Sequence, residues 1–222
     1  MTTYFAFRAS QDLSESSHLL MENFEKGVRE PQSTLFVKVA QLFADEIVDT
    51  LLLNLVRNSS NQSHASSLES FAGIIKSTVN TLIKQVLGKM SNEELQPLSG
   101  YIRKRRLELN LNGETHDYIV FETPADYHAR FRAVLEKGLQ GELDKDEMMA
   151  CMDIFHNLSL TAFYDESLAQ IKLGFIGRKV AEMGGSAIRK GSHSMTHRTI
   201  PHMHGDDLKH FSGYFLSMLV TV

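Results

Sequence analysis

The chain's longest apolar stretch, from Leu35 to Val56, reads LFVKVAQLFADEIVDTLLLNLV. Apolar residues recur in it every three to four positions, which is the period of an amphipathic α-helix with one broad buried face. Thr34, immediately before the stretch, is a residue type that commonly caps a helix. Polar residues interrupt the stretch too often for a segment that inserts unaided into hydrocarbon. We therefore expect a core helix here rather than a membrane span.

Similar apolar periods indicate helices along most of the remaining chain. After a polar run at residues 58–64, the period returns over 66–87 and ends at Gly88, a helix-terminating residue type. Because the helices over 35–56 and 66–87 carry wide apolar faces and a short loop joins them, we expect them to pack as a central pair. Further helices are expected near residues 12–26, 91–97, 124–138, 144–159, 165–183 and 206–219.

One segment near the middle of the chain departs from the helical period. Leu107 to Leu111 alternates apolar and polar residues, and Asn112-Gly113 follows, which is the strongest short signal for a β-hairpin turn. We predict a mainly α, bundle-like domain of several helices over residues 1–222 with one central β-hairpin. Residues 184–205 are rich in Gly, Ser and His, and we expect them to form a loop before a C-terminal helix.

Composition and charge narrow the classes of function. The 222 residues carry a formal net charge of −4, which gives no general affinity for nucleic acid or acidic membranes. Cys151 is the only cysteine, so an intramolecular disulfide is excluded and a reducing compartment is favoured. Because residues 1–8 lack a basic segment followed by an apolar run, no signal peptide is evident and the expected location is the cytoplasm. Self-association into a homo-oligomer stays open.

Local positive charge is the first candidate functional signal. Four consecutive cations precede the predicted hairpin, and three more, Arg189, Lys190 and Arg198, lie in the predicted loop. Clustered cations bind phosphates, and a neighbouring tyrosine can stack on a base. The alternative is a solvated helix face that is balanced by the acidic run at residues 142–147. The predicted nucleic-acid-binding residues are Tyr101, Arg103, Lys104, Arg105, Arg106, Arg189 and Lys190.

Histidines near the C-terminus form the second candidate site, at His193, His197, His202 and His204. Neutral imidazoles bind zinc, nickel and copper. Residues four apart share a helix face, and residues two apart share a strand face. If the chain binds a transition metal such as zinc, these four histidines are the predicted ligands. A chance cluster in a solvated loop is the alternative, since the chain contains ten histidines.

The third candidate is the pair Arg57 and His64, at the junction between the two strongest helical segments. The pattern Arg57-Asn58-x5-His64 resembles the Arg-x4–6-His motif of HEPN ribonucleases, which are all-α proteins. The resemblance implies cleavage without a metal, in which the arginine stabilises charge on the phosphate and the histidine transfers a proton. An arginine at a helix end and a histidine in a loop are also common solvated residues.

No complete catalytic motif is visible in the sequence. A phosphate-binding glycine loop, a nucleophile elbow and a His-Glu-x-x-His zinc motif are all absent. The predicted function is therefore a non-enzymatic regulatory or adaptor protein that binds an anionic macromolecule, either nucleic acid or an acidic protein surface. The alternative is a hydrolytic enzyme, either metal-dependent through the C-terminal histidines or a metal-independent ribonuclease that uses Arg57 and His64.

Overall fold

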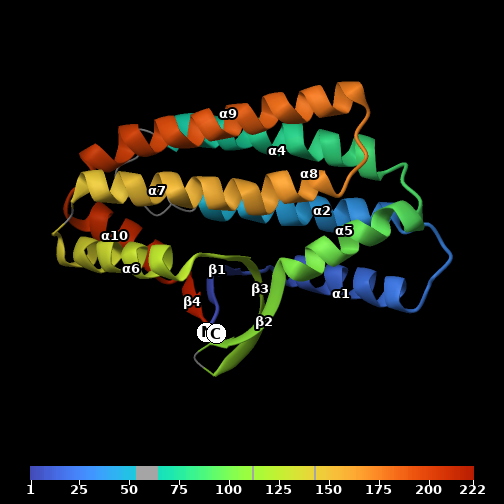
Figure 1. Cartoon of the computed structure of the whole chain (residues 1–222), viewed down its shortest axis with the longest axis horizontal. Helices are drawn as coiled ribbons and strands as arrows, with labels where there is room; N and C mark the ends of the chain where they lie inside the picture. Colours follow the sequence, from blue (N-terminus) through green and yellow to red (C-terminus); the bar gives the residue numbers. More distant parts are fainter. Residues whose placement is uncertain (54–64, 112, 143) are drawn as a thin grey trace.

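The computed structural model of the chain describes residues 1–53, 65–111, 113–142 and 144–222 (Figure 1). It is mainly α with a small antiparallel sheet, as predicted. The helices are α1 (Gln11–Glu25), α2 (Ser33–Val48), α4 (Ala65–Leu87), α5 (Asn92–Lys104), α6 (Ala125–Gln140), α7 (Lys145–Leu160), α8 (Glu166–Ala169), α9 (Phe175–Thr199) and α10 (Gly205–Leu216). The strands are β1 (Thr3–Arg8), β2 (Arg106–Leu111), β3 (Glu114–Glu122) and β4 (Leu219–Thr221). No helix in the described ranges is long and apolar enough to span a bilayer.

The helices form a layered bundle beside the sheet. In Figure 1, α4 and α9 lie along one side, α2 and α7 lie beneath them, and α1, α5, α6, α10 and the sheet form the opposite side. α2 packs along α4, and α7 packs along α9. The expected pairing of the first two long apolar helices is therefore confirmed.

The predicted hairpin is confirmed, and the sheet extends beyond it. β2 and β3 pair in antiparallel register from Arg106↔Ile119 to Leu111↔Glu114. Gly113 has a φ of 85°, a left-handed conformation that suits glycine, while Asn112 lies outside the described residues. β1 and β4 complete the order β2-β3-β1-β4, so both ends of the chain lie together in the sheet (Figure 1).

One face of the sheet packs on the helices through phenylalanine rings. Phe5 of β1 lies 4.5 Å from Phe155 of α7 between ring centroids, and Phe121 of β3 lies 5.8 Å from the same ring. Phe131 and Phe215 complete the group, and all five side chains are fully buried. This aromatic core, defined by these five residues, joins the sheet to α6, α7 and α10.

The segment 184–205 is helical over most of its length, so the prediction of a loop there is wrong. α9 runs without a break to Thr199, and a short 3₁₀ turn, Ile200–His202, follows it. Close packing explains the glycines, because a Cβ at Gly185 would lie 2.8 Å from the ring of Tyr164. A Cβ at Gly191 would lie 2.1 Å from the ring of Phe71. The glycines thus allow aromatic rings to approach the helix.

Two further boundaries differ from the expectation. α5 continues through Pro97 instead of stopping there, and a complete capping box between Ser91 and Glu94 stabilises its first turn. After α7 the chain forms a π-helical turn, Thr161–Asp165, and then the four-residue α8, in place of the expected long helix from residue 165. This π-helical turn is important for the candidate site because it directs two aromatic side chains between α2 and α9.

Candidate functional site

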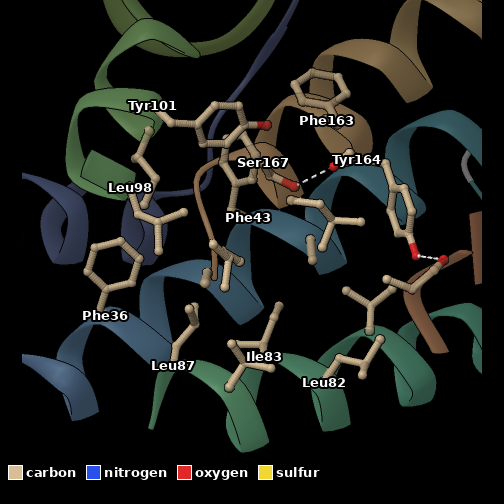
Figure 2. A pocket seen from close by; sticks show the side chains of 18 of the residues that line it. Phe36, Phe43, Leu82, Ile83, Leu87, Leu98, Tyr101, Phe163, Tyr164 and Ser167 are labelled. Atoms are coloured by element: carbon tan, nitrogen blue, oxygen red, sulfur yellow. Dashed lines mark hydrogen bonds between the residues drawn. The ribbon is translucent and has the colours of Figure 1, made fainter. Parts of the chain in front are cut away.

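α2 and α4 pack along each other, but their side chains leave a pocket of about 150 Å³ between them and α5 (Figure 2). Its floor and walls are almost wholly apolar. Figure 2 shows that the side chains come from several elements: Phe36 and Phe43 from α2, Leu82, Ile83 and Leu87 from α4, and Leu98 from α5. A pocket of this kind favours hydrocarbon over water, because it offers water few hydrogen-bond partners.

The π-helical turn after α7 forms the wall on the side of the sheet. Phe163 lies 5.8 Å from the ring of Phe43 and 5.4 Å from the ring of Phe121, so it separates the pocket from the aromatic core. Tyr164 follows it and lines the pocket next to Ala181 of α9. Isolated π-helical turns occur frequently at functional sites. Here the extra residue per turn places both rings in the wall.

Three hydroxyl groups line the pocket, and each donates a hydrogen bond to the backbone. Tyr101 donates to the carbonyl of Ala162 over 2.8 Å, and Tyr164 donates to the carbonyl of Ala181. Ser167 donates to the carbonyl of Tyr164 over 2.8 Å (Figure 2). Burial raises the pKa values of Tyr101 and Tyr164, so both phenols stay neutral at physiological pH. The pocket therefore presents apolar surface to a ligand and no charged group.

A second, open cleft of about 690 Å³ lies beside the pocket, between α8 and the first half of α9. The two spaces share five lining residues: Tyr164, Leu168, Ile171, Leu173 and Ala181. The lining of the cleft is charged: it includes the cations Lys172, Arg178 and Arg189 and the acids Asp165 and Glu182. Arg189 pairs with Asp165. Within the described part of the chain, Lys172 and Arg178 form no ion pair, so an anion that enters the cleft meets two free cations.

The basic run before the hairpin is already paired with acids of the same chain. Arg103 pairs with Glu25 over 2.6 Å, and Arg106 pairs with Asp117 over 2.7 Å. Lys104 and Arg105 both contact Glu166, over 3.0 Å and 2.6 Å. Tyr101 is buried against the pocket and Arg189 pairs with Asp165, whereas Lys190 is exposed on α9. Of the predicted nucleic-acid-binding residues, only Lys190 thus keeps an exposed and unpaired charge among the described residues.

The structure brings together two of the four predicted histidine ligands and adds a carboxylate. His193 and His197 lie one turn apart on α9, and both contact Asp153 of α7, over 2.9 Å and 3.0 Å. Their potential ligand atoms all lie within 4.8 Å of one another. His202 and His204 lie beyond the end of α9 and are not part of this group. Asp153 was missing from the predicted ligands because the second half of α9 was expected to be a loop.

His156 lies one turn beyond Asp153 on α7, on the inner side of the same contact between α7 and α9. Its Nδ1 lies 3.5 Å from the Oγ1 of Thr196. Burial lowers the pKa of His156 to about 4, so the imidazole is neutral at physiological pH.

The predicted catalytic pair, Arg57 and His64, lies outside the described residues. Comparisons with known protein families, curated proteins and solved structures found no significant match to this chain.

Proposed function

We propose that the protein binds a small amphiphile, with its hydrocarbon part in the pocket between α2 and α4 and its anionic group in the adjoining cleft. The observation that carries this proposal is the apolar pocket of about 150 Å³, which shares five lining residues with a cleft where Lys172 and Arg178 pair with no described acid. Engineered apolar cavities of about this volume bind benzene-sized molecules. The pocket thus suits a ring or an alkyl chain of about six carbons.

Burial of the hydrocarbon part alone is expected to give a weak but measurable complex. Burial of a CH₂ group contributes about 0.8 kcal/mol, so about six carbons contribute roughly 5 kcal/mol before the costs of association. Before those costs, this corresponds to a Kd of about 0.2 mM, so we expect a Kd of about 1 to 10 mM for the hydrocarbon part, and any tighter binding has to come from the head group or a longer chain. The pocket hydroxyls already donate to the backbone, so they add little specificity.

Lys172 and Arg178 are the residues that favour an anionic head group over a neutral one. Both line the cleft, both are exposed, and neither forms an ion pair with a described residue. Glu182 in the same wall opposes a second negative charge, so a singly charged carboxylate fits this cleft better than a polyphosphate does. A short-chain fatty acid has the required chemistry.

Binding of an anionic macromolecule, as predicted from the sequence, receives less support from the geometry. The cations at residues 103–106 are paired within the chain, and Tyr101 is buried. Such cations have to exchange an existing partner for a phosphate, which lowers the gain from each contact. We therefore favour a small ligand over nucleic acid.

Titration calorimetry with hexanoate tests the proposal. We expect saturable binding to the wild type and at least about tenfold weaker binding to Ala40→Leu, whose longer side chain fills the pocket. Ala133→Leu is the matched control, because Ala133 is exposed on α6 and the substitution leaves the pocket unchanged. No binding to the wild type at about 10 mM hexanoate, or equal binding to the Ala40→Leu variant, would show that the pocket is only a packing defect.

A second pair of variants tests the head-group assignment. Arg178→Gln should reduce hexanoate affinity to that of hexanol, which lacks the charge, while leaving hexanol binding unchanged. Lys190→Gln removes an exposed charge from the same helix outside the cleft and serves as its control. Equal affinities of the wild type for hexanoate and hexanol would reject the role of the cations while keeping the apolar pocket.

A further inference from the structure

α7 and α9 carry a second site, away from the amphiphile pocket, at the other end of their contact. Asp153 of α7 points at α9, where it meets His193 and His197. One carboxylate oxygen lies 2.9 Å from the Nδ1 of His193, and the other lies 3.0 Å from the Nε2 of His197. The two imidazole rings are 4.1 Å apart between centroids. Two nitrogens and a carboxylate therefore converge from two helices.

We propose that Asp153, His193 and His197 bind one divalent transition-metal ion of the zinc type. Two imidazoles and one carboxylate are a donor set that zinc uses in proteins with a fourth, exchangeable position. Bond lengths of about 2.0 to 2.2 Å in a tetrahedral site place neighbouring ligand atoms about 3.3 Å apart. The observed oxygen–nitrogen separations of 2.9 and 3.0 Å are within a few tenths of an ångström of this value, and all the potential ligand atoms lie within 4.8 Å of one another.

The helical spacing explains why the two histidines act together. Residues four apart lie on one face of a helix, so His193 and His197 both project toward α7 and each reaches one oxygen of Asp153. His156 Nδ1 and Thr196 Oγ1, 3.5 Å apart, lie beside them in the same contact between α7 and α9. The backbone thus preorganises the three donors, and binding costs little rearrangement.

The site is accessible from solvent. The side chains of Asp153, His197 and His193 are 32%, 40% and 61% exposed, so an ion can enter without opening the fold. Water then fills the remaining coordination position. A metal at this place would link α7 to α9 by ligand bonds and stabilise their packing, since it binds the folded arrangement and few such donor sets form in the unfolded chain.

Zinc titration of untagged, chelator-treated protein tests this proposal. We expect one Zn²⁺ per chain by calorimetry, and a rise in the melting temperature of about 5 °C at roughly 100 times the Kd. Asp153→Asn and His197→Gln should each weaken zinc binding at least about tenfold, because each removes a ligand. Melting in the presence of chelator shows whether these variants fold as the wild type does.

The double variant His202→Ala/His204→Ala is the matched control. Both histidines are exposed, near in sequence and outside the proposed ligand set, so zinc binding should be unchanged. A zinc stoichiometry near zero in the wild type overturns the proposal. Loss of binding in the double variant, or full binding in Asp153→Asn, overturns it as well, because either result places the ion elsewhere in the histidine-rich segment.

Discussion

Two apolar regions lie on opposite sides of Phe163, and they are packed in different ways. On the side of the sheet, the aromatic core is filled, and the ring of Phe155 contacts the four other rings of that core at centroid distances of 4.5 to 6.3 Å. On the side of α2 and α4, equally apolar side chains leave a pocket of about 150 Å³. Phe43 on this side has one ring neighbour within the described residues, Phe163.

The comparison shows that an apolar pattern predicts burial but not packing density. Protein interiors normally pack as tightly as organic crystals, and a void forfeits the dispersion contacts of its lining. A pocket of this size therefore lowers the free energy of unfolding. The aromatic core next to it shows that the same chain can also pack apolar side chains without such a space. Ligand binding is one reason to retain such a space.

The largest expected effect comes from deletion of a ring on each side of Phe163. Phe155→Ala should lower the free energy of unfolding by about 4 to 5 kcal/mol, since the filled core cannot collapse around the missing ring. Phe43→Ala should cost less, about 2 to 3 kcal/mol, because part of its surface already faces the pocket. Denaturant unfolding of both variants measures the difference. Equal losses would contradict the contrast in packing.

The next effect comes from a half-buried carboxylate of β3, on the side of the sheet. Asp117 accepts hydrogen bonds from Ser14 and His18 and pairs with Arg106, whose side chain is 8% exposed. Burial alone would raise the pKa of Asp117, but the hydrogen bond from Ser14 and the charge of Arg106 outweigh burial and lower it. Asp117→Asn should therefore cost about 1.5 to 3 kcal/mol at neutral pH.

The pH dependence of the same variant has a defined sign. Because the folded-state pKa of Asp117 is lowered, its contribution is complete above the unfolded-state value of about 3.9 and is lost as pH falls through the folded-state value. The gap in unfolding free energy between wild type and variant should therefore shrink below about pH 4. Glu166→Gln beside the pocket is the comparison, and its effect should be smaller because the Glu166 side chain is 38% exposed. A gap that stays constant with pH would reject the ion pair.

A smaller change in stability is expected when one alanine is enlarged in each of two places: Ala72 in the buried cluster between α2 and α4, and Ala40 in the wall of the pocket. Ala72 is fully buried in a filled cluster with Val48 and Ile75, so Ala72→Leu should cost about 1 to 3 kcal/mol through overpacking. Ala40 lines the pocket, so Ala40→Leu should leave the melting temperature unchanged or raise it. A similar loss for both variants in thermal unfolding would show that the pocket collapses or is closed in solution.

The fold was predictable from the sequence wherever local patterns and tertiary packing agree. The apolar period that begins at Leu35 and the hairpin signal around Gly113 both gave the correct type of element, over the part of each that the structure describes. The order of the sheet was not predictable, because β1 and β4 pair only through contacts between the two ends of the chain. The second half of α9 was missed for another reason: glycines that usually end helices here lie against the rings of Tyr164 and Phe71.

The candidate sites depend even more on contacts that are distant in sequence. The pocket lies among α2, α4, α5, α8, α9 and the π-helical turn of residues 161–165, and no local pattern identifies such a space. For the proposed metal site, the pairs Asp153-x2-His156 and His193-x3-His197 were visible as helical spacings. These two spacings indicate a shared site only when the whole of α9 is recognised as a helix that packs along α7. Because the second half of α9 was predicted as a loop, Asp153 of α7 was not recognised as a candidate ligand.

The smallest expected effect tests whether glycine is required in the contact between α4 and α9. Gly73 is exposed in the interior of α4, and a Cβ there would meet no atom within 4 Å. Gly73→Ala should therefore stabilise the protein by about 0.5 to 1 kcal/mol, since alanine loses less backbone entropy on folding. Gly191→Ala in α9 gains the same entropy, but its Cβ would lie 2.1 Å from the ring of Phe71, so the ring has to move. Because Phe71 packs against the cluster between α2 and α4, we expect the displaced contacts to cancel that gain or reverse it. Chemical denaturation of the two variants measures both signs, and stabilisation by Gly191→Ala as large as that by Gly73→Ala would show that α9 does not approach α4 this closely in solution.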